Sequence, residues 1–90
     1  MLKLKSSARD RKRYILINGK KEDVERAILD YIGILGWAKA SPRFVSFGRD
    51  SCVLAVNREQ LENVKASFVV SDKQIDVLRV SGTLKGLRKT

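Results

Sequence analysis

The side chains that most often carry out catalysis are scarce in this sequence of 90 residues. It contains no histidine, the commonest general base and metal ligand, and a single cysteine, Cys52, which is too few for a thiolate zinc site. Cys52 lies in an apolar run, so we expect a small core residue in a reducing compartment. Gly33 and Gly36 continue a helical pattern instead of following a strand. They therefore do not form a phosphate-binding loop of the Walker or dinucleotide type.

The acidic residues make a similarly weak case for catalysis. Four of them lie in or near the first turns of predicted helices, where the helix dipole favours negative charge: Glu22, Asp23, Glu59 and Glu62. One enzyme class stays open as an alternative, because an acylphosphatase cradles phosphate in the loop after its first strand. That loop would be residues 18–21, Asn-Gly-Lys-Lys, which is a weak match. We expect no catalytic residue, no metal ligand and no cofactor bound by the protein itself.

Positive charge is concentrated at the two ends of the chain. Nineteen Lys and Arg against ten Asp and Glu give a formal net charge of +9, which makes a polyanion the expected partner. Residues 1–13 and 81–90 together hold nine basic residues and one acid, or +8, whereas residues 14–80 contribute only +1. The domain body is thus nearly neutral and its ends are cationic.

Length and hydropathy indicate one soluble domain. A chain this short is large enough for one hydrophobic core and too small for two. Its apolar stretches fall well short of the roughly 20 residues of a membrane span, and the first residues include no hydrophobic signal region. We therefore expect a single domain over residues 1–90, with basic tails at 1–12 and 84–90, in the cytoplasm.

The hydropathy pattern predicts four strands and two helices. Strands are expected over residues 13–18, 43–47, 51–57 and 74–80. The first helix is expected over residues 22–35, with Gly36 in the left-handed position after it, and Gly33 suggests close packing against a neighbour. The second helix follows Asn57, which we expect to cap it. Pro42 cannot donate to a ladder, so the second strand should lie at an edge of the sheet.

The order strand, helix, strand, strand, helix, strand predicts an α+β fold. It is the split arrangement of a ferredoxin-like (RRM-like) sandwich, in which a four-stranded antiparallel sheet with spatial order 4-1-3-2 packs against two helices. The first and last strands are then antiparallel neighbours, so the start of one lies beside the end of the other. Both cationic ends should leave the same rim of the sheet and form one basic surface.

Base stacking on the sheet is not expected. The first strand faintly resembles one of the two short motifs of RNA-recognition domains, but the third strand has no aromatic residue on which a base could stack. We therefore expect Tyr14, Phe44 and Phe47 to serve as core or interface residues. Binding should depend on phosphate contacts and on RNA shape.

Four segments of the chain resemble one family. Residues 80–86, Val-Ser-Gly-Thr-Leu-Lys-Gly, resemble the Val-Ser-Gly-Thr-Ile-Lys signature of archaeal ribonuclease P protein component 2, a relative of the eukaryotic ribonuclease P/MRP subunits. Residues 11–15 resemble that family's Arg-x-Arg-Tyr-Ile entry to the first strand. Residues 34–40 resemble its Glu-Leu-Gly-x-Ala-Lys-Ala, and residues 56–59 match its Val-Asn-Arg-Glu. The resemblance extends over nearly the whole chain from Arg11 onward.

The resemblance implies a subunit of a ribonucleoprotein. Such a protein binds the catalytic half of the ribonuclease P RNA and pairs with another protein component of the holoenzyme. The RNA and its bound Mg²⁺ remove the 5′ leader of precursor tRNA, which the protein contacts only indirectly, so no activity is expected of the chain alone.

The expected RNA site combines the two cationic ends with the turn of the family signature. It consists of Arg11, Lys12, Arg13, Ser81, Gly82, Thr83, Lys85, Arg88 and Lys89. The hydroxyls and the glycine backbone of the turn are expected to approach phosphate closely. A second hypothesis is a basic protein-interaction module of another ribonucleoprotein, in which the charged ends are incidental.

Overall fold

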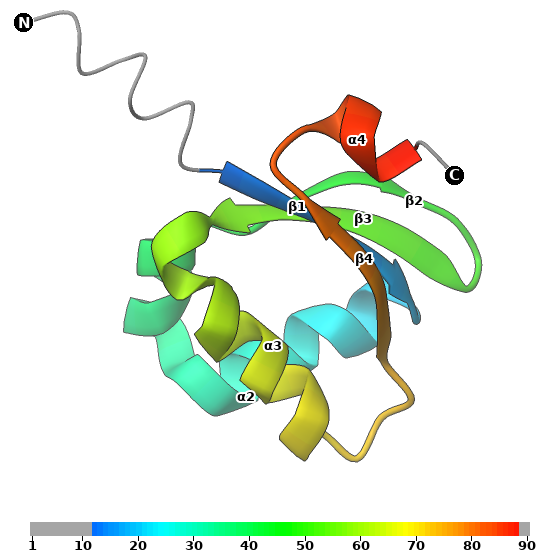
Figure 1. Cartoon of the computed structure of the whole chain (residues 1–90). Coiled ribbons are helices and arrows are strands. Elements are labelled where there is room, and N and C mark those ends of the chain that lie inside the picture. The colour runs from blue at the N-terminus through cyan, green and yellow to red at the C-terminus, as the bar shows by residue number, and fades with distance from the viewer. Residues whose placement is uncertain (1–11, 89–90) are drawn as a thin grey trace, which may run out of the picture.

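The computed structural model describes residues 12–88, of which Arg88 is described by its backbone only. The strands are β1 (Lys12–Asn18), β2 (Arg43–Phe47), β3 (Ser51–Asn57) and β4 (Asp76–Ser81). The helices are α2 (Lys21–Ala40), the 3-10 turn η1 (Arg58–Gln60), α3 (Leu61–Val70) and α4 (Leu84–Arg88). All strand pairs are antiparallel, and the sheet order β2-β3-β1-β4 confirms the predicted sandwich (Figure 1). Pro42 precedes β2, which lies at an edge as predicted.

The core lies between the sheet and helices α2 and α3. Successive side chains of β1 and β3 point to opposite faces of the sheet. The side chains on one of these faces are fully buried because that face packs on the helices. These residues are Ile15, Ile17, Leu54 and Val56, and they meet Val24, Ile28, Val64 and Phe68 from the helices. Cys52 belongs to the same cluster and is 2% exposed, which confirms its predicted place in the core.

Helix α2 is interrupted at Gly33, where the backbone is non-helical at φ 73° and ψ −178°. Only glycine adopts this region without strain. The helix then resumes and continues to Ala40, so the predicted end before Gly36 is wrong. Gly36 lies inside the second segment, where an added Cβ would be 2.6 Å from the Cβ of Ile32. The predicted close packing at Gly33 is also wrong, because an added Cβ there would meet no described atom within 4 Å.

The backbone at Gly33 makes a testable contribution to stability. We expect Gly33→Ala to lower the free energy of unfolding by about 1–3 kcal/mol, the cost of holding an alanine in this region. Gly48→Ala is the matched control, since Gly48 is exposed and an added Cβ would lie 4.0 Å from the nearest oxygen, that of Ser51. Urea denaturation of both variants measures the difference. Equal losses would show that the geometry of Gly33 carries no special cost.

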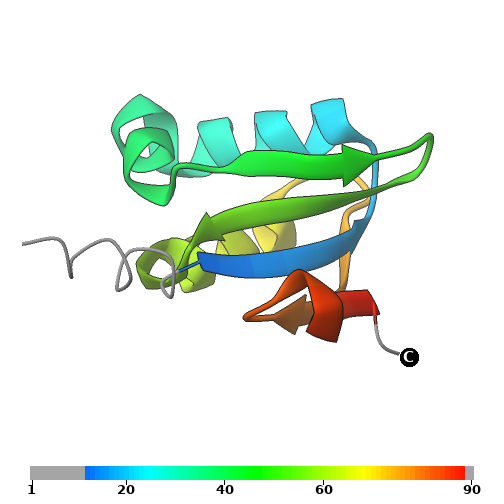
Figure 2. The same cartoon turned by 90° about the horizontal axis from the view of Figure 1, so that it is seen from above.

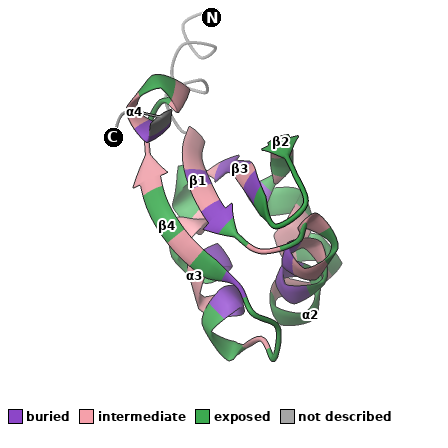
Figure 3. Cartoon of the chain, turned by 90° about the vertical axis from the view of Figure 1, so that its right-hand side faces the viewer, coloured by how far each residue is buried: buried purple, intermediate pink, exposed green. Residues whose placement is uncertain are grey.

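Helix α4 lies on the face of the sheet opposite α2 and α3 (Figures 1 and 2). The sequence predicts only a basic tail over residues 84–90, whereas residues Leu84–Arg88 form this short helix. Leu87 is 2% exposed and stands outside the main core cluster. Figure 3 shows that α4 has a buried segment of its own. Helix α4 therefore has its own apolar contact with what is here called the open face of the sheet.

Candidate nucleic-acid interface

The structure describes most of the predicted RNA site. Arg11 and Lys89 lie outside the described residues, and of Arg88 only the backbone is described. The remaining six residues lie in three neighbouring elements: Lys12 and Arg13 in β1, Ser81 in β4, and Gly82, Thr83 and Lys85 in the turn into α4 and its first residues.

The start of β1 and the end of β4 are side by side. Tyr14 pairs with Ser81 across the two strands. The side chain of Arg13 extends along this junction: its Nη1 donates to the carbonyl oxygen of Lys12 at 3.0 Å, and lies 3.4 Å from where a Cβ on Gly82 would be. The described basic residues of β1 are thus next to the signature turn, as the strand order predicts.

The hydroxyls of the signature turn hold the start of α4. Ser81 Oγ accepts the backbone N–H of Thr83 at 3.2 Å, and Thr83 Oγ1 accepts the backbone N–H of Gly86 at 2.9 Å. Thr83 therefore acts as the N-cap of α4. Both hydroxyl oxygens are engaged as acceptors, but each hydroxyl hydrogen can still donate to a phosphate oxygen.

Two glycines of the turn differ in what surrounds them. A Cβ on Gly86 would lie 2.5 Å from Ser81 Oγ and 3.1 Å from Thr83 Oγ1, whereas one on Gly82 would meet only the flexible end of Arg13. We expect Gly86→Val to displace these hydroxyls and to destabilise α4 by about 1–3 kcal/mol. The matched control, Gly82→Val, should cost less than about 0.5 kcal/mol. Hydrogen exchange at the backbone N–H of Leu87 measures both, and equal protection in the two variants would contradict this account.

The two ends of the sheet differ in charge. One end, where β1 and β2 begin and β3 and β4 finish, is here called the basic end. Among described residues it carries six cations and two carboxylates, a net charge of +4: Lys12, Arg13, Lys39, Arg43, Arg58 and Lys85 against Glu59 and Glu62. The opposite end carries four cations and five carboxylates: Lys20, Lys21, Arg49 and Lys73 against Glu22, Asp23, Asp50, Asp72 and Asp76. The charges of the described residues therefore attract a polyanion to the basic end and not to the opposite end.

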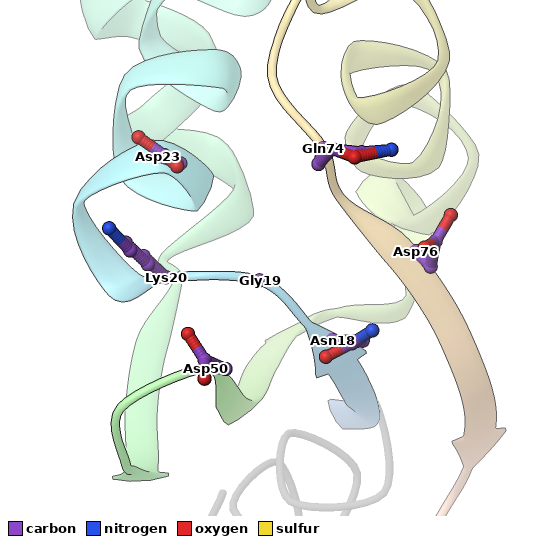
Figure 4. A pocket seen from close by; sticks show the side chains of 7 residues that line it. All are labelled: Asn18, Gly19, Lys20, Asp23, Asp50, Gln74 and Asp76. Atoms are coloured by element: carbon purple, nitrogen blue, oxygen red, sulfur yellow. The ribbon is translucent and has the colours of Figure 1, made fainter.

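A cleft of about 430 Å³ at the opposite end tests the acylphosphatase alternative (Figure 4). It contains Gly19 and Lys20 of the loop that would have to cradle phosphate. Three aspartates also line it, Asp23, Asp50 and Asp76. Their negative charges would repel an acyl phosphate, so the arrangement disfavours that reaction.

Comparison with known proteins supports the family resemblance. The sequence matches no protein-family model. It is 26% identical to ribonuclease P protein component 2 of Methanococcus maripaludis (strain C7), over 99% of this chain and 82% of that protein. The corresponding proteins of M. maripaludis (strain C6) and Methanococcus vannielii are 26% and 28% identical over the same shares. The chain is similar to ribonuclease P protein component 2 over nearly its whole length. The likeness to component 2 covers the strands, both main helices and the signature turn.

The strand register arranges four residues in a row across the open face. Arg43 of β2 pairs with Ala55 of β3, Ala55 with Tyr14 of β1, and Tyr14 with Ser81 of β4. Ala55 is 5% exposed yet lies outside the main core cluster, because its side chain is on this face and not under the helices.

The open-face cleft lies at this row. It has a volume of about 370 Å³ and is lined by Lys12, Tyr14, Arg43, Phe44, Val45, Ala55 and Leu84. Sequence reasoning missed it because strand register and the position of α4 decide which side chains meet there.

The aromatic residues divide between the two faces. Phe44 packs against the core as predicted, and Phe47 is 57% exposed with Lys21 Nζ 4.5 Å from its ring centroid. Tyr14 is half-buried on the open face, beside the basic end. Its ring therefore borders a cleft that also contains cations.

Within residues 12–88, no three His, Cys, Asp or Glu side chains gather closely enough to hold a metal ion. None of the helices in that range combines the length and the apolar character that crossing a membrane requires.

Proposed function

We propose that this chain is an RNA-binding subunit of ribonuclease P, and that its basic end contacts the phosphate backbone of the ribonuclease P RNA. The observation that carries the proposal is the junction of β1, β4 and α4. There the described cations Lys12, Arg13 and Lys85 lie beside the family's signature turn. The relatives support the choice of RNA, since each is named as a ribonuclease P protein component.

In this proposal the protein supports the catalytic half of the RNA, and the RNA with its Mg²⁺ removes the 5′ leader of precursor tRNA in the cytoplasm. Arg11, Arg88 and Lys89 would extend the contact made by Lys12, Arg13 and Lys85. The role of this chain's own residues is to bind and position phosphates. Lys and Arg do so by charge, and the turn does so through hydroxyl and backbone N–H donors.

Reconstitution tests the proposal. Precursor tRNA cleavage is measured with the RNA and companion subunits, with and without this chain, over a range of Mg²⁺ concentrations. We expect the chain to raise the rate most at low Mg²⁺, because neutralising phosphates replaces part of the ion's role in RNA folding, and to cleave nothing when alone. An unchanged rate at every Mg²⁺ concentration would overturn it.

The exposed apolar face of α2 favours a second role, contact with another protein subunit. Ile34 and Leu35 follow the interruption at Gly33 and are 81% and 79% exposed. Adjacent apolar side chains this exposed are typical of protein interfaces. In contrast Trp37, two residues further along the same helix, packs against the core.

A paired substitution tests this role. We expect Ile34→Ser with Leu35→Ser to weaken binding of companion ribonuclease P subunits at least about 10-fold, given that two buried aliphatic side chains contribute more than about 1.4 kcal/mol. RNA binding should not change. Val69→Ser with Val70→Ser on α3 is the control, as both valines are also exposed.

If the chain is instead a protein module with incidental charge, it will bind structured RNA and an inert acidic polymer equally weakly.

A further inference from the structure

The open-face cleft has an apolar interior and a cationic rim. Ala55 forms its floor between Tyr14 and Arg43, which lie on the strands to either side. Because neighbouring strands are about 4.8 Å apart, the backbones of Tyr14 and Arg43 are separated by roughly 10 Å. A methyl group between them leaves this space open, and Leu84 of α4 closes it on one side.

We propose that this cleft binds one unpaired nucleotide of an RNA, with the base against the Tyr14 ring and the adjacent phosphates near Lys12 and Arg43. The inference rests on the proposed function and specifies which part of the RNA the open face takes. Its volume of about 370 Å³ lies in the range of roughly 300–1,000 Å³ that small-ligand sites occupy.

The combination of lining residues points to a nucleotide. A base is flat with apolar faces, so it fits beside an aromatic ring and the side chains of Ala55 and Leu84. Its phosphates need cations, and the cleft has two and no carboxylate. Three other clefts of the described surface each contain at least two aspartates, which would repel the same ligand. Base stacking is therefore expected on the open face despite the absence of an aromatic residue from β3.

The ligand must be single-stranded. Inside a duplex a base is stacked on both faces and cannot lie against a protein ring, whereas bases in loops and bulges can be splayed out. Helix α4 also limits the space for a duplex at the cleft, since Leu84 lines the cleft and Leu87 is buried beneath the helix. The rest of the basic end would hold the neighbouring phosphates of the same RNA.

Two variants of Tyr14 in the full chain test the proposal. The probes are a fluorescent single-stranded oligouridylate and an RNA duplex of equal length, titrated at several salt concentrations. Tyr14→Leu keeps the apolar bulk and removes the ring, so we expect single-strand affinity to fall by roughly 5- to 150-fold, the range measured for base stacking. Tyr14→Phe should bind as the wild type does. Duplex affinity and its salt dependence should be unchanged in both.

Arg43→Gln is a further variant that should leave the fold unchanged, because Arg43 is exposed on an edge strand. It should weaken single-strand binding while duplex binding changes less. Crosslinking of 4-thiouridine RNA to the peptide that contains Tyr14 would confirm the contact.

If Tyr14→Leu binds both probes as the wild type does, the nucleotide site is wrong and the proposed function stands. If the wild type binds neither probe in a salt-dependent way, the proposed function fails as well. If Tyr14→Leu weakens the binding of a companion protein subunit and leaves the binding of RNA unchanged, the cleft is a site for that protein.

Discussion

Replacing Lys12, Arg13 and Lys85 together by Gln should lower the affinity for ribonuclease P RNA by roughly 100-fold near physiological salt. Each side chain is expected to contact a phosphate, and the loss of one such contact is worth about 1 kcal/mol net. Each also releases counterions, so the slope of log affinity against log salt should become shallower by about 2 to 3. Filter binding between about 50 and 200 mM salt gives both quantities.

The opposite end of the sheet supplies the control. Lys20, Arg49 and Lys73 are exposed, and their replacement by Gln removes the same charge from the chain. We expect this triple variant to lose less than about 5-fold in affinity, because its cations lie among five carboxylates and not beside the signature turn. If both triple variants lose affinity equally, the protein responds to net charge alone and the basic end is not the site.

The thiol of Cys52 should react with a disulfide reagent at pH 8 about 100-fold more slowly than an exposed cysteine. Burial raises the pKa of Cys52 from 9.0 to about 11, so only about one-thousandth of it is thiolate at that pH. The side chain is also 2% exposed, which limits the reagent's access. Urea should restore the rate of a free thiol. A Ser51→Cys variant in a Cys52→Ala background is the control, since Ser51 is the exposed neighbour on the open face.

The same pKa shift predicts how stability changes with pH. The folded-state pKa of Cys52 is raised, so its contribution is fully present below about pH 9, the ordinary pKa, and is lost as pH rises toward about 11. The free energy of unfolding should fall over that window by more in the wild type than in Cys52→Ala. Rapid thiol reaction in the native protein, or equal pH profiles, would contradict a buried and inert Cys52.

Much of the sheet was predictable because its local signals agree with its tertiary structure. The bounds of β2 and β3 follow from two apolar runs joined by the turn at residues 48–50, and Pro42 specifies the edge position of β2. Helix α2 was harder. It has two glycines three residues apart, and Gly33, not Gly36, adopts the positive φ. Either glycine tolerates that conformation, so the hydropathy pattern does not distinguish them.

The candidate site was predictable only in part, for two physical reasons. Helix α4 has five residues, too few to show a helical period, and it is held by the Thr83 cap and the burial of Leu87. The open-face cleft depends on register: a shift of one residue in β1 would turn Tyr14 toward the helices. Hydropathy alone favours a place in the core for the Tyr14 ring. The pairing of Tyr14 with Ala55 places it on the open face instead.

The unequal charges at the two ends of the sheet also affect how the protein approaches its target. A strand of seven residues spans about 23 Å, so among residues 12–88 a net charge of +4 lies about that far from a slightly negative region. This part of the chain therefore has a permanent electric dipole. The electric field of a polyanion exerts a torque on this dipole, and this torque turns the basic end, with its signature turn, toward the polyanion before any contact forms. Encounters then begin in a productive orientation, and added salt should slow association more than it speeds dissociation.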